Sequence, residues 1–439
     1  MRWKGPALAL LGAAAVVGIA IGFTLGGGDG TTITDASGTT NAGSGSQTAS
    51  TTTGTGTSTP LVQLPKPGEI RPGHRLIVAT VDDAVRQTDP KFAAQLMKIS
   101  HDAGFDAIMV SSLWKPGAAG PSAQERLTLG NVVKAADSEG MRVFVFVWHG
   151  LSGATPRTVR GRRQFAAYAA ALARAFPQIR DFVVGNEPNL NTFWMPQFGP
   201  GGRDAAASGY LDLLARTYDA LKAVSPDIQV IGGALAPRGS DRPGTKRDTH
   251  SPTKFIEDLG AAYRASHRST PIMDAFAIHP YMRTSKLPPT DTHAASTTIT
   301  VGDYPKLVTL LARAFTGTPQ RGPGLPVYYT EFGVQTRVPA AHRHAYTDPH
   351  SPSAIDAVDP QTQARYYREA LALAACQPTV KGLFVFHTFD EPDLAGWQSG
   401  LYYANQQPKP SLPAFRKAAA EARAASLTDC SGITFVPKK

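Results

Sequence analysis

The chain has 439 residues, of which 42% are hydrophobic and 18% are charged, and its formal net charge is +10. This balance is that of a soluble globular protein, long enough for two or three average domains or for one large barrel. Although the positive charge could indicate an anionic partner, the sequence contains no dense Lys/Arg run with interleaved aromatic residues. Many arginines lie on predicted helix surfaces. We therefore interpret the charge as solvated helix faces and predict no nucleic-acid partner.

The N-terminus carries an export signal. Arg2 and Lys4 precede a charge-free, largely apolar stretch over residues 5–28, which approaches the ~20 residues needed to span a bilayer. We predict a signal peptide or signal anchor over residues 1–28, and favour the anchor because Ala13–Ala15 lie too early for a cleavage site. The protein would then be extracytoplasmic in the cell envelope, membrane-anchored or secreted, and would contact the membrane through this segment only.

The next segment, residues 29–73, is rich in Gly, Ser, Thr and Pro, a composition that indicates a disordered linker. Residues 74–439 are predicted to hold the folded domain with a C-terminal tail. The only two cysteines are Cys376 and Cys430. In an exported protein they are predicted to form a disulfide that ties the tail to the last helices, with two unpaired thiols as the alternative.

From residue 74, short apolar runs alternate with amphipathic segments. The runs predicted as strands are 76–81, 107–112, 143–148, 182–186, 229–233, 275–279, 327–330 and 383–387. The segments predicted as helices are near 90–103, 122–139, 158–176, 204–224, 252–267, 303–316, 360–376 and 411–425. Eight such repeats predict the α/β class and a closed (β/α)8 TIM barrel. An open doubly wound sheet is the alternative, but no Gly-x-Gly-x-x-Gly turn follows the first strand.

The lengths of the predicted loops support a barrel and locate its active face. Connections from helix to strand are short, as at 177–180 and 226–228, whereas several from strand to helix are long, as at 189–203 and 333–359. In a TIM barrel the longer loops build the face at the carboxyl ends of the strands, which holds the active site. Residues 333–359 are expected to form a solvated flap.

Two of the predicted strands end in acids. The fourth ends in Asn186-Glu187-Pro188 and the seventh in Thr330-Glu331. A proline disfavours helical geometry in the residue before it, so Glu187 is expected to stay extended. Strands four and seven lie across the mouth of an eight-stranded barrel, where their acids can face each other over a sugar. A retaining glycosidase needs such a pair, about 5–5.5 Å apart, one acid to protonate the leaving oxygen and one to attack the anomeric carbon.

Aromatic and imidazole side chains end other strands: Trp148 and His149 on the third, His279 and Tyr281 on the sixth, and His387 on the eighth. Rim aromatics offer apolar faces for sugar rings. The histidines lack the His-x-His or His-Glu-x-x-His spacing of metal sites. We therefore predict a carbohydrate substrate and neither a metal nor an organic cofactor.

Taken in order, these motifs resemble clan A of the glycoside hydrolases, the four-seven barrels, with families 5 and 39 as the nearest. Over about residues 74–425 the resemblance rests on Gly104-Phe105-Asp106, His149-Gly150, Asn186-Glu187-Pro188, His279-Pro280-Tyr281 and Thr330-Glu331-Phe332-Gly333. It implies a retaining β-glycosidase. The implied roles are Glu187 as general acid/base, Glu331 as nucleophile, Tyr281 as its hydrogen-bond donor, and Asn186, His149 and His279 as sugar contacts.

The chain departs from this pattern at two positions. Family 5 members carry an arginine on strand two that supports the nucleophile, and alignment on Gly104-Phe105 places Met109 there. The tryptophan of strand eight is displaced, so Trp397 on the following loop becomes a candidate sugar platform. The departure at Met109 motivates an alternative function, a catalytically silent barrel that binds cell-wall glycan. The third functional hypothesis is a metal-dependent barrel hydrolase. We expect a monomer, and the sequence does not identify the sugar.

Overall fold

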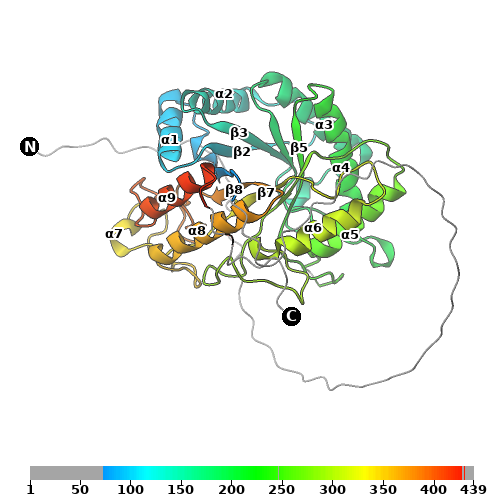
Figure 1. The fold of residues 1–439 in the computed structure, drawn as a ribbon. Helices are drawn as coiled ribbons and strands as arrows, with labels where there is room; N and C mark the ends of the chain where they lie inside the picture. Colours follow the sequence, from blue (N-terminus) through cyan, green and yellow to red (C-terminus); the bar gives the residue numbers. More distant parts are fainter. Residues whose placement is uncertain (1–72, 246, 428–429, 431–439) are drawn as a thin grey trace, which may run out of the picture.

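The structure is a computed structural model, in which residues 73–245, 247–427 and 430 are described (Figure 1). The predicted signal or anchor at 1–28, the linker up to residue 72 and most of the C-terminal tail lie outside the described residues. Within the described ranges, no helix is both long and apolar enough to cross a membrane.

Eight parallel strands close into a barrel in chain order, which confirms the predicted (β/α)8 fold. The strands are β1 (Ile77–Val81), β2 (Ala107–Leu113), β3 (Arg142–Trp148), β4 (Asp181–Val184), β5 (Gln229–Leu235), β6 (Ala275–Ile278), β7 (Val327–Phe332) and β8 (Val380–Phe386). Pairing of β1 with β8, for example Ala79 with Phe384, closes the sheet. Because all strands run in one direction, their carboxyl ends and the loops that follow them lie at one rim.

Helices surround the strands (Figure 1). They are α1 (Pro90–Asp102), α2 (Ala123–Ser138), α3 (Val159–Ala175), α4 (Ala205–Lys222), α5 (Pro252–Ala265), α6 (Tyr304–Phe315), α7 (Ala340–Arg343), α8 (Pro360–Cys376) and α9 (Leu412–Arg423). Many begin where the sequence supplies a cap. The side chains of Asp89, Ser122, Thr158 and Ser251 each accept a hydrogen bond from a backbone N–H in the first turn of their helix.

The strands are buried on both faces, which explains their continuous apolar runs. On β2, Ile108 and Val110 belong to the large core that the strands share with the helices. The alternate residues, Ala107 and Met109, belong to a second cluster with Phe144 and other side chains that fill the barrel interior. The interior is therefore packed mainly with apolar side chains.

Two features differ from the sequence predictions. The fourth strand ends at Val184, before Asn186 and Glu187, because the chain turns sharply at Gly185. The loop over 333–359 is not simply a solvated flap: Val338 and Tyr346 are buried there. The hydroxyl of Tyr346 donates a hydrogen bond of 2.8 Å to Asp390. This loop is therefore anchored to the segment that follows β8.

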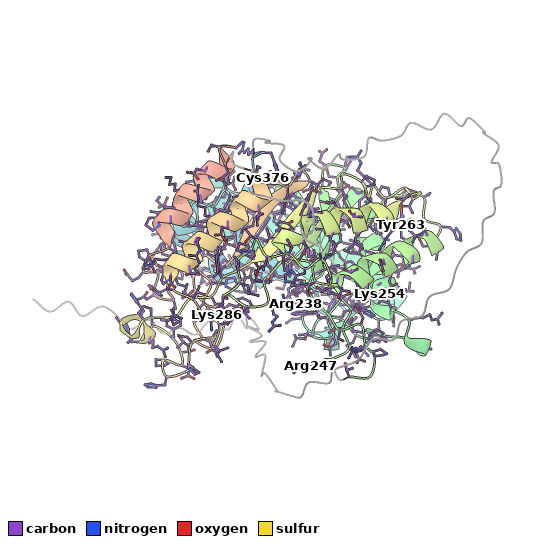
Figure 2. The ribbon with its side chains drawn as sticks, turned by 60° about the horizontal axis from the view of Figure 1, so that its bottom comes forward. Arg238, Arg247, Lys254, Tyr263, Lys286 and Cys376 are labelled. Atoms are coloured by element: carbon purple, nitrogen blue, oxygen red, sulfur yellow. A yellow bond between two sulfur atoms is a disulfide. The ribbon has the colours of Figure 1, made fainter. Side chains whose placement is uncertain are left out.

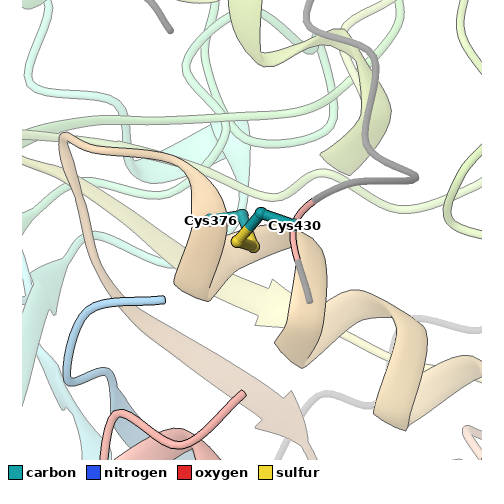
Figure 3. Close-up of a disulfide and its surroundings, with 2 residues drawn as sticks. All are labelled: Cys376 and Cys430. Carbon is teal, nitrogen blue, oxygen red and sulfur yellow. A yellow bond between two sulfur atoms is a disulfide. The ribbon is translucent and has the colours of Figure 1, made fainter. Parts of the chain in front are cut away.

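Cys376 and Cys430 form the predicted disulfide, with their Cα atoms 5.7 Å apart (Figure 3). Cys376 is the last residue of α8. The bond therefore attaches the chain beyond α9 to the end of α8, as the sequence analysis expected.

Candidate active site

The two predicted catalytic acids meet at one imidazole. Nδ1 of His279 lies 3.0 Å from Oε1 of Glu187 and 3.5 Å from Oε2 of Glu331. The two carboxylate oxygens can therefore lie no further apart than the sum of these distances, 6.5 Å. The turn after β4 and the end of β7 thus bring the two acids to the same imidazole. The side chains retain 12% and 14% of their surface exposed, so both can be reached from outside.

Glu187 does not have the extended backbone that its proline neighbour predicts. Its φ is +38°, and Gly185 two residues earlier has a φ of +82°. The backbone N–H of Glu187 donates a hydrogen bond of 2.9 Å to the carbonyl of Ala234 on β5. This long-range bond holds the tight turn against local preference. Such a positive φ costs about 1–3 kcal/mol in a non-glycine residue, and strained residues of this kind cluster at functional sites.

Glu331 lies within β7, and its carboxylate has two polar neighbours. The hydroxyl of Tyr281 donates a hydrogen bond of 3.1 Å to Oε2, the same oxygen that faces His279. Burial raises the pKa of Glu331 to about 7, and the charge of Glu187 adds to this rise, while His279 and Tyr281 oppose it. Two donors are therefore too few to hold this carboxyl fully ionised near neutral pH.

His279 takes part in the charge balance of the site. Burial alone would lower its pKa, but Glu331 and Glu187 together raise the pKa above the usual value. The two acids therefore favour the protonated imidazole over the neutral one. Met109 supplies no charge: its side chain is 1% exposed and lies in the apolar interior of the barrel.

The residues at the end of β3 also lie at this rim. Trp148 is half-buried, and its indole Nε1 has no hydrogen-bond partner within the described part of the chain. His149 is 5% exposed, and burial lowers its pKa to about 4, so the ring is neutral at physiological pH. Its ring packs 5.5 Å from that of Trp194, in the loop that follows Glu187. Asn186 is half-buried directly before Glu187.

Trp397 is brought to the site although it lies far along the loop after β8. Its ring centroid is 5.1 Å from that of Tyr281 and 5.7 Å from that of Phe386, the last residue of β8. Since Tyr281 bonds Glu331, this aromatic group lies beside the proposed nucleophile. Burial lowers the pKa of the neighbouring His387 to about 3, so that imidazole stays neutral.

Sequence reasoning missed Arg238, which follows β5. Its Nη1 donates a hydrogen bond of 3.0 Å to the backbone carbonyl of Tyr281. Burial lowers the pKa of this guanidinium, and the charge of Glu187 opposes that shift, so the cation interacts with the candidate acid. Arg238 is labelled in Figure 2. The sequence feature that could have identified Arg238 is its place near the start of a long loop from strand to helix, at the face where the active site is expected. Phe386 was also missed, because the run 383–387 was treated only as a strand.

No protein-family model matches the sequence, and no curated protein matches it. Solved structures match its fold. A family 39 β-xylosidase from Caulobacter crescentus is 18% identical, with a TM-score of 0.50 over 81% of this chain and 73% of that chain. A glycoside hydrolase of family 5, subfamily 18, from Streptomyces cattleya, in complex with GlcNAc, is 18% identical, with a TM-score of 0.50 over 81% of each chain.

A β-glucosidase from Thermotoga maritima in complex with deoxynojirimycin is 13% identical, with a TM-score of 0.51 over 75% of this chain and 86% of that chain. At these identities the likeness concerns the fold. The expected resemblance to the clan A barrels is confirmed at that level, with family 39 and family 5 both among the matches.

Proposed function

We propose that the protein is a retaining β-glycosidase that hydrolyses O-glycosidic bonds of a polysaccharide or glycoside. The observation that carries the proposal is the convergence of Glu187 and Glu331 on one nitrogen of His279, at 3.0 and 3.5 Å. The upper bound of 6.5 Å on the distance between these two oxygens is compatible with the spacing of about 5–5.5 Å between the carboxyl groups of retaining enzymes, and it coincides with the lower end of the inverting range of about 6.5–9.5 Å.

The proposed reaction proceeds by double displacement. The carboxylate of Glu331 attacks the anomeric carbon while Glu187 donates its proton to the glycosidic oxygen, so the C–O bond to the leaving group breaks. A glycosyl ester forms on Glu331. Water then attacks the same carbon, Glu187 removes its proton, and the ester bond breaks to release the sugar with its original configuration. His279 contacts both acids, and Tyr281 orients the nucleophile.

The assignment of Glu331 as nucleophile rests on its hydrogen-bond donor and its position on β7. A pKa of about 7 would also suit an acid, but the charge that develops on the sugar in the transition state favours an ionised carboxylate beside it. The free protein therefore has to lose the Glu331 proton before it reacts. This requirement makes the activity rise as pH increases through about 7.

A carbohydrate substrate is supported by the surroundings of the two acids. Trp397 and Tyr281 offer aromatic surface next to Glu331. The unpartnered Nε1 of Trp148 is a donor that a sugar hydroxyl could satisfy. The β-xylosidase and β-glucosidase with the same fold make aryl β-xylosides and aryl β-glucosides the first substrates to try.

The test is turnover on a panel of aryl β-glycosides and polysaccharides by the wild-type protein and by Glu331→Gln. We expect hydrolysis by the wild-type protein alone. Equal residual activity in the two proteins would reject the assignment. Arg337→Gln, on the loop after β7, is a suitable control, because its Nη1 bonds the carbonyl of Ala357 rather than either acid.

The second candidate function is a catalytically silent barrel that binds cell-wall glycan. It is favoured by Met109, which supplies no charge to Glu331. Glycan binding without turnover, unchanged in Glu331→Gln, would support it against the first proposal.

We further propose that the chain acts in the cell envelope as a monomer, anchored or exported through residues 1–28. The support is the charge-free apolar stretch after Arg2 and Lys4. Fractionation of expressing cells tests the location: recovery in the cytoplasm without any membrane or secreted fraction would contradict it.

A further inference from the structure

A second cluster of two acids and a histidine lies away from the catalytic pair, where the loops after β4 and β5 meet α4 and α5. Asp204 caps the N-terminus of α4, His250 ends the loop before α5, and Asp258 lies on α5. One ligand atom from each of these three residues lies within 4.8 Å of the other two. The side chains of Asp204 and His250 are each only 2% exposed.

Buried polar atoms in this cluster lack the partners that such atoms normally have. Within the described residues, Oδ2 of Asp204, Oδ2 of Asp258 and Nδ1 of His250 are buried without a hydrogen bond. Buried polar groups are nearly always satisfied, and two adjacent carboxylates need a proton or a cation between them.

We propose that Asp204, His250 and Asp258 bind a divalent cation, with Zn²⁺ as the ion that fits the donors. An imidazole nitrogen and carboxylate oxygens are common Zn²⁺ ligands, at about 2.0–2.2 Å. In tetrahedral coordination with bonds of this length, two ligand atoms of the same Zn²⁺ lie about 3.4 Å apart. Nε2 of His250 and Oδ1 of Asp204 are 3.3 Å apart, which matches this spacing. Ca²⁺ is a poorer match because it takes oxygen ligands.

The third proposed ligand, Asp258, already forms an ion pair with a lysine. Nζ of Lys254, one turn earlier on α5, forms an ion pair with Oδ1 of Asp258, and its side chain is 49% exposed (Figure 2). The ammonium occupies one oxygen and leaves Oδ2 of Asp258 buried and free. The partial neutralisation by Lys254 lowers the affinity of the cluster for a cation. Removal of this ammonium should therefore strengthen cation binding.

The cation would connect segments that begin next to the candidate active site. Without a cation, Nε2 of His250 donates a hydrogen bond of 3.1 Å to the carbonyl of Gln197, in the loop that starts after Glu187. A cation on Nε2 would replace this proton, and the ring would then carry its proton on Nδ1, which lies 3.8 Å from Oδ1 of Asp241. In the same loop, Asn189 bonds His250 through the backbone carbonyl and through the side chain, at 2.8 and 3.0 Å. Binding at the cluster would thus fasten this loop to the loop after β5 and stabilise the folded protein.

The experiment is calorimetric titration of the chelator-stripped full-length protein with ZnCl₂, paired with thermal melting. We expect one site in the wild-type protein and a rise in melting temperature with Zn²⁺. Asp204→Asn and His250→Gln should each weaken binding about 100-fold or more, since even loss of an outer-shell partner costs about 10–100-fold. Lys254→Gln should bind Zn²⁺ more tightly than the wild-type protein.

The control is Asp227→Asn, which removes the same charge from an exposed acid in the turn between α4 and β5 and should bind Zn²⁺ as the wild-type protein does. If Asp204→Asn fails to fold, Asp258→Asn serves in its place. The proposal is overturned if Zn²⁺ produces neither heat nor a melting shift, or if the variants bind it like wild type. Binding of CaCl₂ but not ZnCl₂ would overturn the role of the imidazole.

Discussion

Two clusters in this barrel use the same side chains, two carboxylates and one imidazole, in different surroundings. At the rim, His279 contacts both Glu187 and Glu331, and Tyr281 donates to Glu331. Between α4 and α5, Asp204 and Asp258 each leave one oxygen buried without a hydrogen bond among the described residues. Exposure does not separate the two pairs, because the side chains of Glu187 and Glu331 are 12% and 14% exposed and those of Asp204 and Asp258 are 2% and 23% exposed. The comparison indicates that residue type alone does not decide between catalysis and cation binding; the hydrogen-bond partners of the carboxylates do.

The largest effect is expected at the proposed nucleophile. Glu331→Gln keeps the size of the side chain but removes the group that forms the covalent bond. We expect kcat/KM to fall on the order of 10⁴-fold or more, because loss of a nucleophile removes the whole covalent route. Asp204→Asn provides the matched change in the other cluster and should leave at least about a tenth of the activity. A similar loss of activity in both variants would contradict the assignment of catalysis to the rim cluster alone.

Substitution of the proposed acid/base should have a smaller effect that depends on the substrate. Glu187→Gln cannot protonate the leaving oxygen, a contribution of about 10²–10⁴-fold. With a leaving group that needs no protonation, such as dinitrophenolate, Glu187→Gln should therefore form the glycosyl-enzyme about as fast as the wild-type protein. The measurement is the rate of glycosyl-enzyme formation against leaving-group pKa. An equal loss for good and poor leaving groups would contradict the assigned role.

The donor from Tyr281 should affect the pH profile. The hydrogen bond from its hydroxyl opposes the rise of the Glu331 pKa to about 7. Tyr281→Phe removes this donor, so the pKa should rise further and the acidic limb of kcat/KM should move to higher pH. A hydrogen bond to a charged group contributes about 1.5–3 kcal/mol, equivalent to about one or two pH units. An unchanged limb would mean that another group sets the profile.

The smallest effect concerns how the second cluster changes the stability of the folded protein. The pKa of Asp204 in the folded protein, about 7, exceeds its ordinary value of 3.8. The protonated form is thus favoured by folding, and this stabilisation is present below pH ~4 and is lost as pH rises through about 7. In chelator, Asp204→Asn should lack this loss and be more stable than wild type at pH 8, by about 1–3 kcal/mol. Urea unfolding of both proteins at pH 4 and pH 8 measures the difference, and parallel pH dependence would contradict it.

Much of the fold was predictable because it depends on local signals. Continuous apolar runs identified all the strands, and amphipathic segments identified the long helices that separate them, whereas the short α7 within the loop 333–359 was not predicted. The paired acids were predictable because a barrel places the ends of strands four and seven opposite each other. The positive φ of Glu187 was not predictable from the sequence, because it depends on a hydrogen bond to Ala234 on the next strand.

Other parts of the two clusters depend on contacts that the sequence does not encode locally. Arg238 reaches the site through the carbonyl of Tyr281, a residue on a different loop. Asp204, His250 and Asp258 come from three segments without any ligand spacing, so the cluster emerges only when the loops after β4 and β5 are packed together. The pKa of Glu331 likewise follows from burial and neighbours, which spacing along the chain does not define.

The central claim is that Glu331 forms a covalent bond with the sugar. The most direct measurement is incubation with dinitrophenyl 2-deoxy-2-fluoro-β-glycosides, which form the ester quickly and hydrolyse it slowly, followed by proteolysis and mass spectrometry. The account predicts one fluoroglycosyl group per chain, on the peptide that contains Glu331. Time-dependent hydrolysis of the parent glycoside with no adduct, or an adduct on Glu187, would contradict it.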